Sequence, residues 1–409
     1  MSRTLVSILT LLVVSGLAVV PAVGAAGSAP VYDHDGSGET VDCSFPITAT
    51  DATGTEVTIE EEPDRLTVLG PSTAQTVWAI GAQEKVVGMS VNPFTSYLEG
   101  SESKTNVVGP RGQPNIESVV GTEPDLVLAP NITSPDAVQS LRDAGLTVYT
   151  FELAGSLDDV NTKTRQIGRL VGSFGSAADV SATTHARIEA VREAVSGAER
   201  PTAYYVFAGP GSFTAGPETF IGDVIDSAGA ENIAAEAGIQ RYGEISQEVL
   251  AANTVDWLVL PGQVQPPVNP AINESRAVAE GNLVRVDSNF ISQPGPRVTQ
   301  PLAAMAQAFH PEAMDGVDVS SIEADSSIQC AANAEPTADE ETTEVVMTPN
   351  GATTTADGDT DDATTTAMAG EETTTAEAGD TSDGSGPGFT AVAALVAVLA
   401  AALLARRRS

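Results

Sequence analysis

Acidic residues recur at a fixed spacing in the two halves of this chain. Glu117 and Glu248 each begin an apolar helical stretch. Asp125 and Asp256 each open an apolar strand, and 131 residues separate the members of either pair. The repeat predicts two similar α/β lobes, each presenting one carboxylate that could form an ion pair with a symmetric partner. In the alternative, one large α/β domain holds two ordinary strand–helix units, and each glutamate is merely favoured by its helix dipole.

The elements that position these carboxylates alternate between strand and helix. A first lobe over residues 43–153 and a second lobe over 201–330 flank the segment 156–197. That segment has helical spacing and no proline, which predicts one long, rigid linking helix that only the glycines near 172 could break. Strands are predicted at 66–71, 85–89, 126–129, 147–151, 202–207, 257–260 and 283–286, and further helices at 72–80, 137–144, 220–227 and 299–309.

Both ends of the chain carry export signals. Residues 1–26 combine an early arginine, an apolar run and small residues, which predicts a secretory signal peptide. Residues 387–409 begin with Pro-Gly-Phe, continue as an apolar segment and end in three arginines before the last serine. This tail resembles the sorting signal of archaeal surface proteins, which an archaeosortase-type transpeptidase replaces with a lipid. The alternative is a plain transmembrane helix, and either anchor places the protein at the outer face of the cell membrane.

The charge of the chain indicates its solvent. Aspartate and glutamate number 55 against 19 lysine and arginine, giving a net charge of −36. The excess is not confined to the tail, because 37 acidic and 15 basic residues lie between Cys43 and Cys330. Molar salt screens such self-repulsion, so the composition predicts a halophile and disfavours nucleic acid as a partner.

The segment 331–386 is rich in threonine, aspartate and glutamate and has no lysine or arginine. It cannot bury enough apolar surface to offset chain entropy, which predicts a disordered stalk. Two sequons, at Asn131 and Asn273, are candidates for N-glycosylation in an exported chain.

The only two cysteines bracket the predicted lobes. Outside the cell a disulfide between Cys43 and Cys330 would tie the start of the folded region to its end. The alternatives are a lipid on Cys43, which lacks the small residues of a lipobox, and two free thiols.

A series of motifs over residues 66–311 resembles the periplasmic cobalamin and ferric-siderophore binding proteins of ABC importers. The motifs occur in the family's order at Leu69–Gln75, Lys85–Gly88, Pro114–Glu117, Glu123–Leu128, Thr214–Gly216, Phe220–Ile225, Ala228–Ile233, Ile245–Glu248 and Pro294–Arg297. The resemblance implies a class III fold, in which a long rigid helix joins two Rossmann-like lobes. It also implies a monomer that performs no chemistry and delivers its ligand to an ABC permease dimer with ATPase subunits. Glu117 and Glu248 would then pair with arginines of the two permease subunits.

Matching motif positions place the ligand between the lobes, against Phe94, Arg111, Phe213, Tyr242 and Arg297. Aromatic faces suit a corrin or a catecholate, and guanidinium groups suit its oxygen atoms; core packing is the alternative for Phe94 and Phe213. The chain has Gln75 where the family usually has glutamate, and Arg111 where cobalamin binders have an aromatic residue. The ligand is therefore expected to be cobalamin or a ferric siderophore, with haem as a further alternative.

Other functions find less support in the residues. Bare metal binding is not expected, because the three histidines are scattered along the chain. A resident cofactor is not expected either, since the chain has no P-loop and no dinucleotide fingerprint. A surface-anchored hydrolase would have to use residues outside any recognised catalytic motif. A structural adhesin would be expected to have repeated all-β domains.

Overall fold

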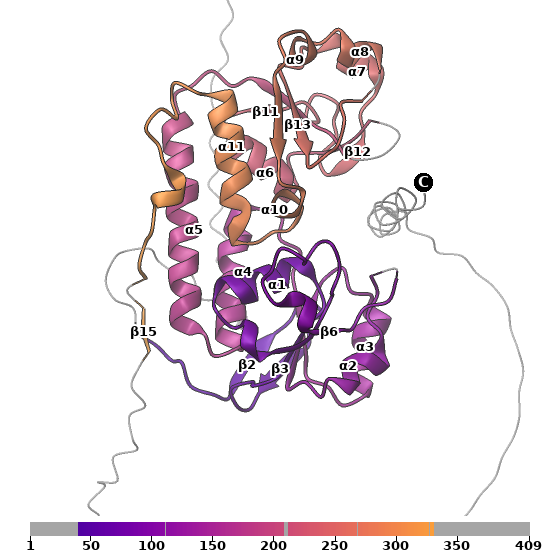
Figure 1. The fold of residues 1–409 in the computed structure, drawn as a ribbon, viewed down its shortest axis with the longest axis vertical. Helices are drawn as coiled ribbons and strands as arrows, with labels where there is room; N and C mark the ends of the chain where they lie inside the picture. The colour runs from indigo at the N-terminus through magenta and orange to yellow at the C-terminus, as the bar shows by residue number, and fades with distance from the viewer. Residues whose placement is uncertain (1–39, 111, 208–211, 268, 327, 331–409) are drawn as a thin grey trace, which may run out of the picture. The chain divides into compact units, whose positions relative to one another are not determined.

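The computed structural model describes residues 40–330 except 111, 208–211, 268 and 327 (Figure 1). The predicted signal peptide, stalk and C-terminal sorting segment lie outside the described residues. So does Arg111. No helix within the described part is long and apolar enough to cross a membrane.

The first lobe is built on a parallel sheet of five strands in the order β6-β5-β4-β7-β8. Its strands are β4 (Leu66–Val68), β5 (Val86–Met89), β6 (Thr105–Asn106), β7 (Leu126–Pro130) and β8 (Val148–Phe151). Alternate residues of β7 join two separate apolar clusters, Leu126 and Leu128 one, Val127 and Ala129 the other. Both faces of the sheet are therefore covered, which explains why its central strands are almost entirely apolar.

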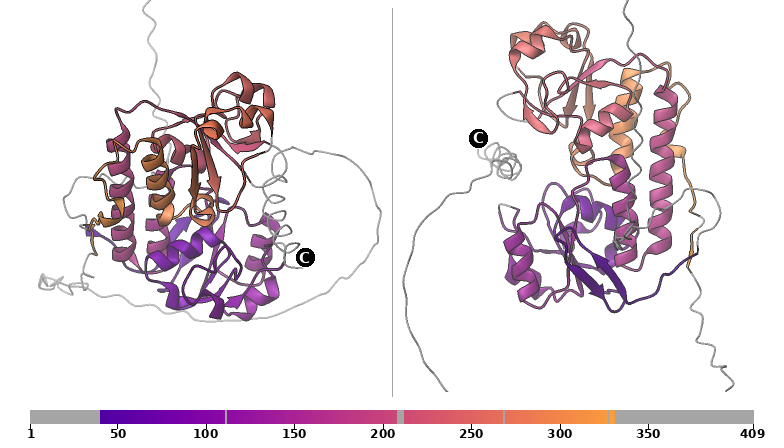
Figure 2. Two further views of the ribbon diagram at one scale, coloured as in Figure 1. Left: turned by 45° about the horizontal axis from the view of Figure 1, so that its top comes forward. Right: turned by 180° about the vertical axis from the view of Figure 1, so that it is seen from behind.

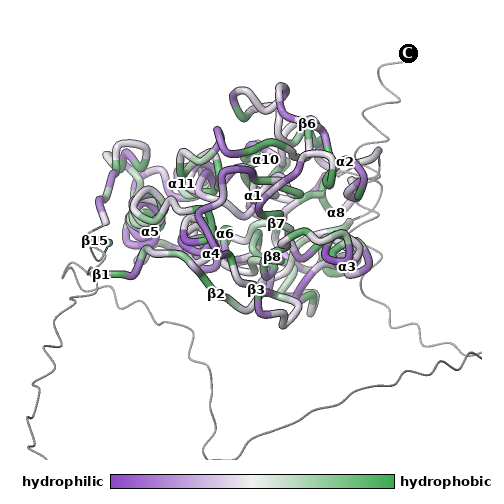
Figure 3. The backbone as a smooth tube through the Cα atoms, turned by 90° about the horizontal axis from the view of Figure 1, so that it is seen from below, coloured by the Kyte–Doolittle hydropathy of each residue, from purple (hydrophilic) through white to green (hydrophobic). Residues whose placement is uncertain are grey.

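One face of this sheet packs on helix α1 and on an antiparallel hairpin, and the other face packs on α2 and α3. The elements are α1 (Pro71–Ala79), β2 (Ile47–Thr50), β3 (Glu56–Ile59), α2 (Ile116–Gly121) and α3 (Pro135–Asp143). The tube of α3 in Figure 3 carries both green and purple segments. Such mixing is expected of a helix with one apolar side on a sheet.

The second lobe repeats this plan with four parallel strands in the order β11-β9-β13-β14. They are β9 (Thr202–Tyr205), β11 (Glu231–Asn232), β13 (Trp257–Pro261) and β14 (Leu283–Val286). One face packs on α6 (Phe220–Ser227) and α11 (Thr299–Phe309), and the other on α7 (Gln247–Ala252), α8 (Pro270–Asn273) and α9 (Arg276–Ala279). A separate antiparallel pair, β10 (Phe213–Ala215) and β12 (Tyr242–Glu244), follows β9.

Apart from the helices of the segment between the lobes, the remaining described elements are short. They are α10 (Ser288–Ser292), the 3-10 turns η1 (Gln83–Lys85), η2 (Ser101–Ser103), η3 (Pro296–Val298) and η4 (Val319–Ser321), and the terminal strands β1 (Thr40–Val41) and β15 (Gln329–Cys330).

The two repeated aspartates hold the central strands of the two sheets in the same way. The Asp125 carboxylate accepts a hydrogen bond from the backbone N–H of Arg65, just before β4, at 2.8 Å. The Asp256 carboxylate accepts one from the N–H of Thr202, at the start of β9, at 3.0 Å. In return, the backbone N–H of Asp125 donates to the carbonyl of Arg65, and that of Asp256 donates to the carbonyl of Thr202. The aspartate half of the sequence repeat is therefore structural.

The predicted single helix over 156–197 is wrong, because the chain turns between two helices. These are α4 (Leu157–Leu170) and α5 (Phe174–Val195), separated by Gly172 at φ 78°. They pack so closely that a Cβ on Gly168 would lie 2.0 Å from the Cβ of Ala177. Ala177 belongs to an apolar cluster of the first lobe, and Ile188 and Val191 to one of the second. Helix α4 also contributes to both clusters, with Leu157 in that of the second lobe and Ile167 in that of the first, so the helix pair packs on both lobes. The rigidity of this linking pair stays a prediction.

A C-terminal strap, the described residues of 319–330, runs alongside α5 (Figures 1 and 2). Three α5 side chains, spaced four residues apart, bind it. Arg187 donates to the carbonyls of Ser320 and Ile322, Thr183 binds Ala324, and Asp179 accepts from Ser326.

The strap ends at the predicted disulfide. Cys43 and Cys330 are bonded, and β1 pairs with β15 in parallel beside them. This pairing confirms the disulfide prediction, and the alternatives of a lipid on Cys43 or two free thiols are wrong.

Removing the disulfide should lower the stability of the folded region without changing its fold. The bond closes a loop of 287 residues, and loop entropy gives an upper limit of about 5–6 kcal/mol for its contribution. We expect Cys43→Ala plus Cys330→Ala to lower the free energy of unfolding by a few kcal/mol, measured by urea titration in molar KCl. An unchanged unfolding midpoint would contradict a stabilising role.

Candidate functional site

The ligand residues predicted from the sequence follow the carboxyl ends of the parallel strands, where open α/β sheets bind ligands. Phe94 lies in the turns after β5, and Arg297 lies in η3, after β14 and α10. Phe213 and Tyr242 lie on β10 and β12, after β9. The structure brings these four residues together as two groups, one at a junction between the lobes and one within the second lobe.

A triangle of hydrogen bonds joins the lobes at the first group. The Lys163 ammonium, on α4, donates to Ser72 Oγ at 2.5 Å and to the Pro294 carbonyl at 2.9 Å. Ser72 Oγ donates to the same carbonyl at 2.5 Å. The sequence predicted that the helix starts at Ser72, but α1 begins one residue earlier, at Pro71. The Ser72 hydroxyl does not cap the helix and is available for this contact. The segment around Pro294, which belongs to the second lobe by sequence, is thereby tied to the first.

A chain of side-chain hydrogen bonds lies beside this triangle. The Arg297 backbone N–H donates to Gln75 Oε1 at 3.0 Å, and Gln75 Nε2 donates to the Tyr97 hydroxyl at 3.1 Å. The Tyr97 hydroxyl donates to Gln293 Oε1 at 2.8 Å, and Gln293 Nε2 donates to the Phe94 carbonyl at 2.9 Å. Burial raises the pKa of Tyr97, against the opposing effects of the Gln75 hydrogen bond and the Arg297 charge, so the hydroxyl keeps its proton.

The Arg297 guanidinium lies against two aromatic rings. Its central carbon is 5.2 Å from the ring centre of Tyr97 and 5.5 Å from that of Phe290, and these rings meet edge to face. The residue is partly exposed. Within the described part of the chain its guanidinium makes no hydrogen bond and no ion pair. A fixed, partly exposed cation with unused donors is suited to an anionic group of a ligand.

The second group is an aromatic cluster around Phe207. Its ring contacts those of Tyr205, Phe213 and Tyr242, with centroids 4.9, 5.6 and 5.9 Å away. Tyr242 is 38% exposed and Phe213 is partly exposed, so neither is an ordinary core residue. Burial strongly raises the pKa of Tyr205, which Ser292 of α10 partly counteracts. Helix α10 therefore lies near both groups, since it also carries Phe290.

Several site residues could not be found from the sequence alone. Phe94 and Arg297 were predicted, but their neighbours Tyr97, Phe290 and Gln293 were not, because the contacts join residues about 200 positions apart. Lys163 was missed as well. The one signal in the sequence that could have pointed to this junction is Gln75, where the proteins that the chain resembles usually have glutamate.

Glu117 and Glu248 occupy equivalent positions in the structure, each the second residue of a short helix. Asn115 caps α2 and Ser246 caps α7 through side-chain oxygen atoms. Both glutamates are exposed, and neither makes a hydrogen bond or ion pair with another described residue. The helix dipole favours a glutamate at both positions, as the alternative explanation of the repeat states. Unlike the paired aspartates, however, their carboxylates are not used by the fold and remain open to a partner.

The two sequon asparagines, Asn131 and Asn273, are both exposed. Asn131 follows β7, at the same edge of the sheet as the predicted ligand residues, whereas Asn273 ends α8. Glycosylation of either stays a prediction.

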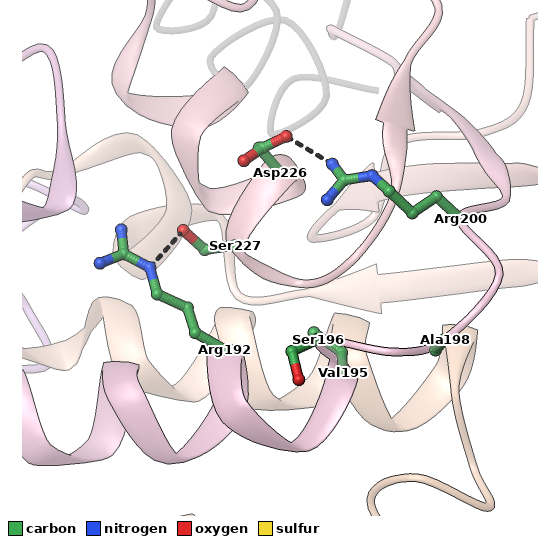
Figure 4. Close-up of a pocket in the computed structure, with 7 residues that line it drawn as sticks. All are labelled: Arg192, Val195, Ser196, Ala198, Arg200, Asp226 and Ser227. Carbon is green, nitrogen blue, oxygen red and sulfur yellow. Dashed lines mark hydrogen bonds and ion pairs between the residues drawn. The ribbon is translucent and has the colours of Figure 1, made fainter.

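The described residues hold no group of three or more histidine, cysteine, aspartate or glutamate side chains that could bind a metal ion. His310 is buried and its Nε2 lies 2.9 Å from the carbonyl of Gly229, which is a structural contact. A cavity of about 370 Å³ lies at the end of α5, lined by residues including Arg192, Arg200 and Asp226 (Figure 4). Its arginines already pair with Glu189 and Asp226, and none of the predicted ligand residues lines it.

Comparisons with known proteins identify the family and the fold. The family model described as periplasmic binding protein matches residues 66–289, more than half of the chain. The chain belongs to the periplasmic binding protein family. As a member it is the substrate-binding component of an ABC importer and not an enzyme. The PGF-CTERM motif matches residues 386–408, as predicted, and marks an exported, C-terminally anchored surface protein.

Individual relatives of this periplasmic binding protein are informative. A cobalamin-binding protein of Halobacterium salinarum is 41% identical over 314 residues, covering 73% of this chain and 84% of its own. An uncharacterised ABC transporter substrate-binding lipoprotein, YvrC of Bacillus subtilis, is 27% identical and covers 66% and 87%. The structure of the periplasmic haem-binding protein RhuT from Roseiflexus matches with a TM-score of 0.55 at 24% identity, over 61% of this chain and 99% of that one. This last match confirms the α/β fold.

The buried ammonium at the junction predicts a specific dependence of stability on pH. Burial lowers the pKa of Lys163 from 10.5 to about 8, so between these pH values the unfolded chain binds more protons than the folded one. The free energy of unfolding should therefore rise with pH in this window, by about 3 kcal/mol at most. Lys163→Met should lack this rise. Urea titrations of both proteins at pH 7.5 and pH 10 measure the difference, and parallel pH profiles would contradict the assignment.

Proposed function

We propose that this binding protein captures a cobalamin-type corrinoid at the junction between its lobes. The observation that carries the proposal is the Arg297 guanidinium, held by Tyr97 and Phe290 with its N–H groups unused by the described residues. The aromatic cluster around Phe207 supplies flat apolar faces for a large conjugated ring. The name of the Halobacterium relative supports the same ligand.

A ferric siderophore or haem is the second candidate. The same guanidinium and aromatic faces would fit catecholate or carboxylate oxygens, and Arg111 stands where cobalamin binders have an aromatic residue. In either case the cobalamin or iron complex is cargo. We propose no resident cofactor.

Delivery would use Glu117 and Glu248 as the two contacts with the permease. Each is exposed, unpaired within the described residues and placed identically on its lobe. An arginine on each permease subunit could hold one carboxylate through two parallel hydrogen bonds. In molar salt the Debye length falls to about 3 Å, so recognition would depend on these short contacts rather than on long-range attraction.

The acidic surface and the tail suggest the setting of this transport. The net charge of −36 favours a halophilic host. The PGF-CTERM motif implies processing by an archaeosortase-type transpeptidase, and we propose that a lipid replaces the apolar tail.

Uptake by intact cells tests the proposed function. Cells that lack this protein should lose high-affinity uptake of labelled cyanocobalamin and should regain it with the wild-type gene. Unchanged cobalamin uptake together with lost uptake of a ferric siderophore or of haemin would move the ligand to the second candidate. Unchanged uptake of all three would contradict the proposal.

Removal of the two docking carboxylates should separate binding from delivery. We expect Glu117→Ala plus Glu248→Ala to leave ligand affinity unchanged and to abolish uptake, because the site residues are untouched while both contacts with the permease are lost. Titration calorimetry and cellular uptake measure the two properties on the same protein.

A matched control is available at the opposite edges of the sheets. Glu61 and Glu199 are also exposed and precede the first strand of each sheet. Glu61→Ala plus Glu199→Ala makes the same change in net charge and should retain uptake. Normal uptake by the first double variant, or equal loss in both, would remove the docking assignment.

A further inference from the structure

The side-chain amide of Gln75 lies at the centre of the polar junction. The residue is fully buried on α1, its oxygen accepts from the Arg297 backbone, and its nitrogen donates to Tyr97. The packing around it is tight, since a Cβ on Gly295 would lie 2.5 Å from Gln75 Oε1. No water-sized space therefore separates the amide from the backbone that carries Arg297.

The direction of the hydrogen-bond chain requires an amide at this position. The Tyr97 hydroxyl donates its single proton to Gln293, so it must accept from the group on its other side. Gln75 supplies that donor through its nitrogen. An ionised carboxylate of the same shape could only accept, and would compete with Gln293 for the Tyr97 proton.

The charge at this position matters more than its hydrogen bonds. Arg297 makes no ion pair with any described residue. Asp287 caps the N-terminus of α10, and its carboxylate accepts hydrogen bonds from the backbone N–H groups of Asn289 and Phe290. Lys163 adds a second positive charge at the same junction. Arg297 and Lys163 carry two positive charges against the one negative charge of Asp287, so the junction keeps a net positive charge that a carboxylate at position 75 would neutralise.

We propose that Gln75 determines ligand specificity by leaving the Arg297 guanidinium without an ion-pair partner, so that the site selects a ligand presenting an anionic oxygen group to this guanidinium. The inference rests on the proposed function and adds to it the chemical class of the group that is recognised. Two sources could supply that group, the phosphodiester of a complete corrinoid or a carboxylate of an iron complex. Gln75 does not touch the anion itself and acts through Arg297.

The test is a double-mutant cycle on the full chain in molar KCl, read by titration calorimetry. The probes are cyanocobalamin, dicyanocobinamide, which lacks the phosphodiester, ferric citrate, and ferrioxamine B, which has no free carboxylate. We expect Gln75→Glu to weaken binding of the anionic probe about tenfold or more, because a buried carboxylate would compete for the guanidinium. The neutral control Gln75→Met should weaken it less.

The Arg297→Gln background distinguishes a charge effect from a packing effect. If Gln75 acts through Arg297, adding Gln75→Glu to Arg297→Gln should change affinity little further. If Gln75→Glu weakens binding of cyanocobalamin more than that of dicyanocobinamide, the recognised anion is the phosphodiester. If it weakens binding of ferric citrate more than that of ferrioxamine B, the recognised anion is a carboxylate. If Gln75→Glu does not fold, Gln293→Glu places the charge in the same hydrogen-bond chain and serves the same cycle.

Each outcome decides the inference. Equal affinity of wild type and Gln75→Glu for every bound probe would overturn it while leaving the proposed function intact. So would the same loss in the Arg297→Gln background, which would indicate packing alone. No binding of any probe by the wild-type protein would contradict the proposed function itself.

Discussion

The carbonyl oxygen of Pro294 accepts hydrogen bonds from Ser72 of the first lobe and from Lys163 of the helix pair. This shared acceptor fixes the segment that carries Arg297 against α1. The adjacent contacts between Gln75, Tyr97 and Gln293 depend on that placement, because they join residues from both lobes. The proposed binding site is thus built from polar groups that are hydrogen-bonded within the protein, whereas the guanidinium that they position has no hydrogen-bond partner among the described residues.

The two lobes use one acidic repeat for two purposes. In each lobe the aspartate carboxylate is used by the fold, because it accepts a backbone hydrogen bond from Arg65, just before β4, or from Thr202, the first residue of β9. The glutamate lies in the first turn of the preceding helix, exposed and without a partner in the described region. Duplication of a structural device therefore provides two equivalent surface carboxylates, which are the two contacts that we propose for the permease.

Local patterns in the sequence predicted most of the framework. Helices α6 and α11 and strand β14 begin and end at the predicted residues, and the disulfide follows from the placement of only two cysteines. The prediction of a single linking helix was wrong because helical spacing continues on both sides of Gly172. Only the positive φ of Gly172 marks where the chain reverses. The site was predicted in part. A motif can nominate Arg297, but its stacking on Tyr97 and Phe290 arises from packing between distant segments.

Hydrogen exchange of the full chain, measured by mass spectrometry in molar KCl with and without cyanocobalamin, tests the location of the site most directly. Bound ligand should slow exchange in the segments 92–98, 213–215, 242–245 and 288–298, which carry Phe94, Phe213, Tyr242 and Arg297. Unchanged exchange in all four segments, or protection confined to the cavity between Arg192 and Arg200, would contradict the account.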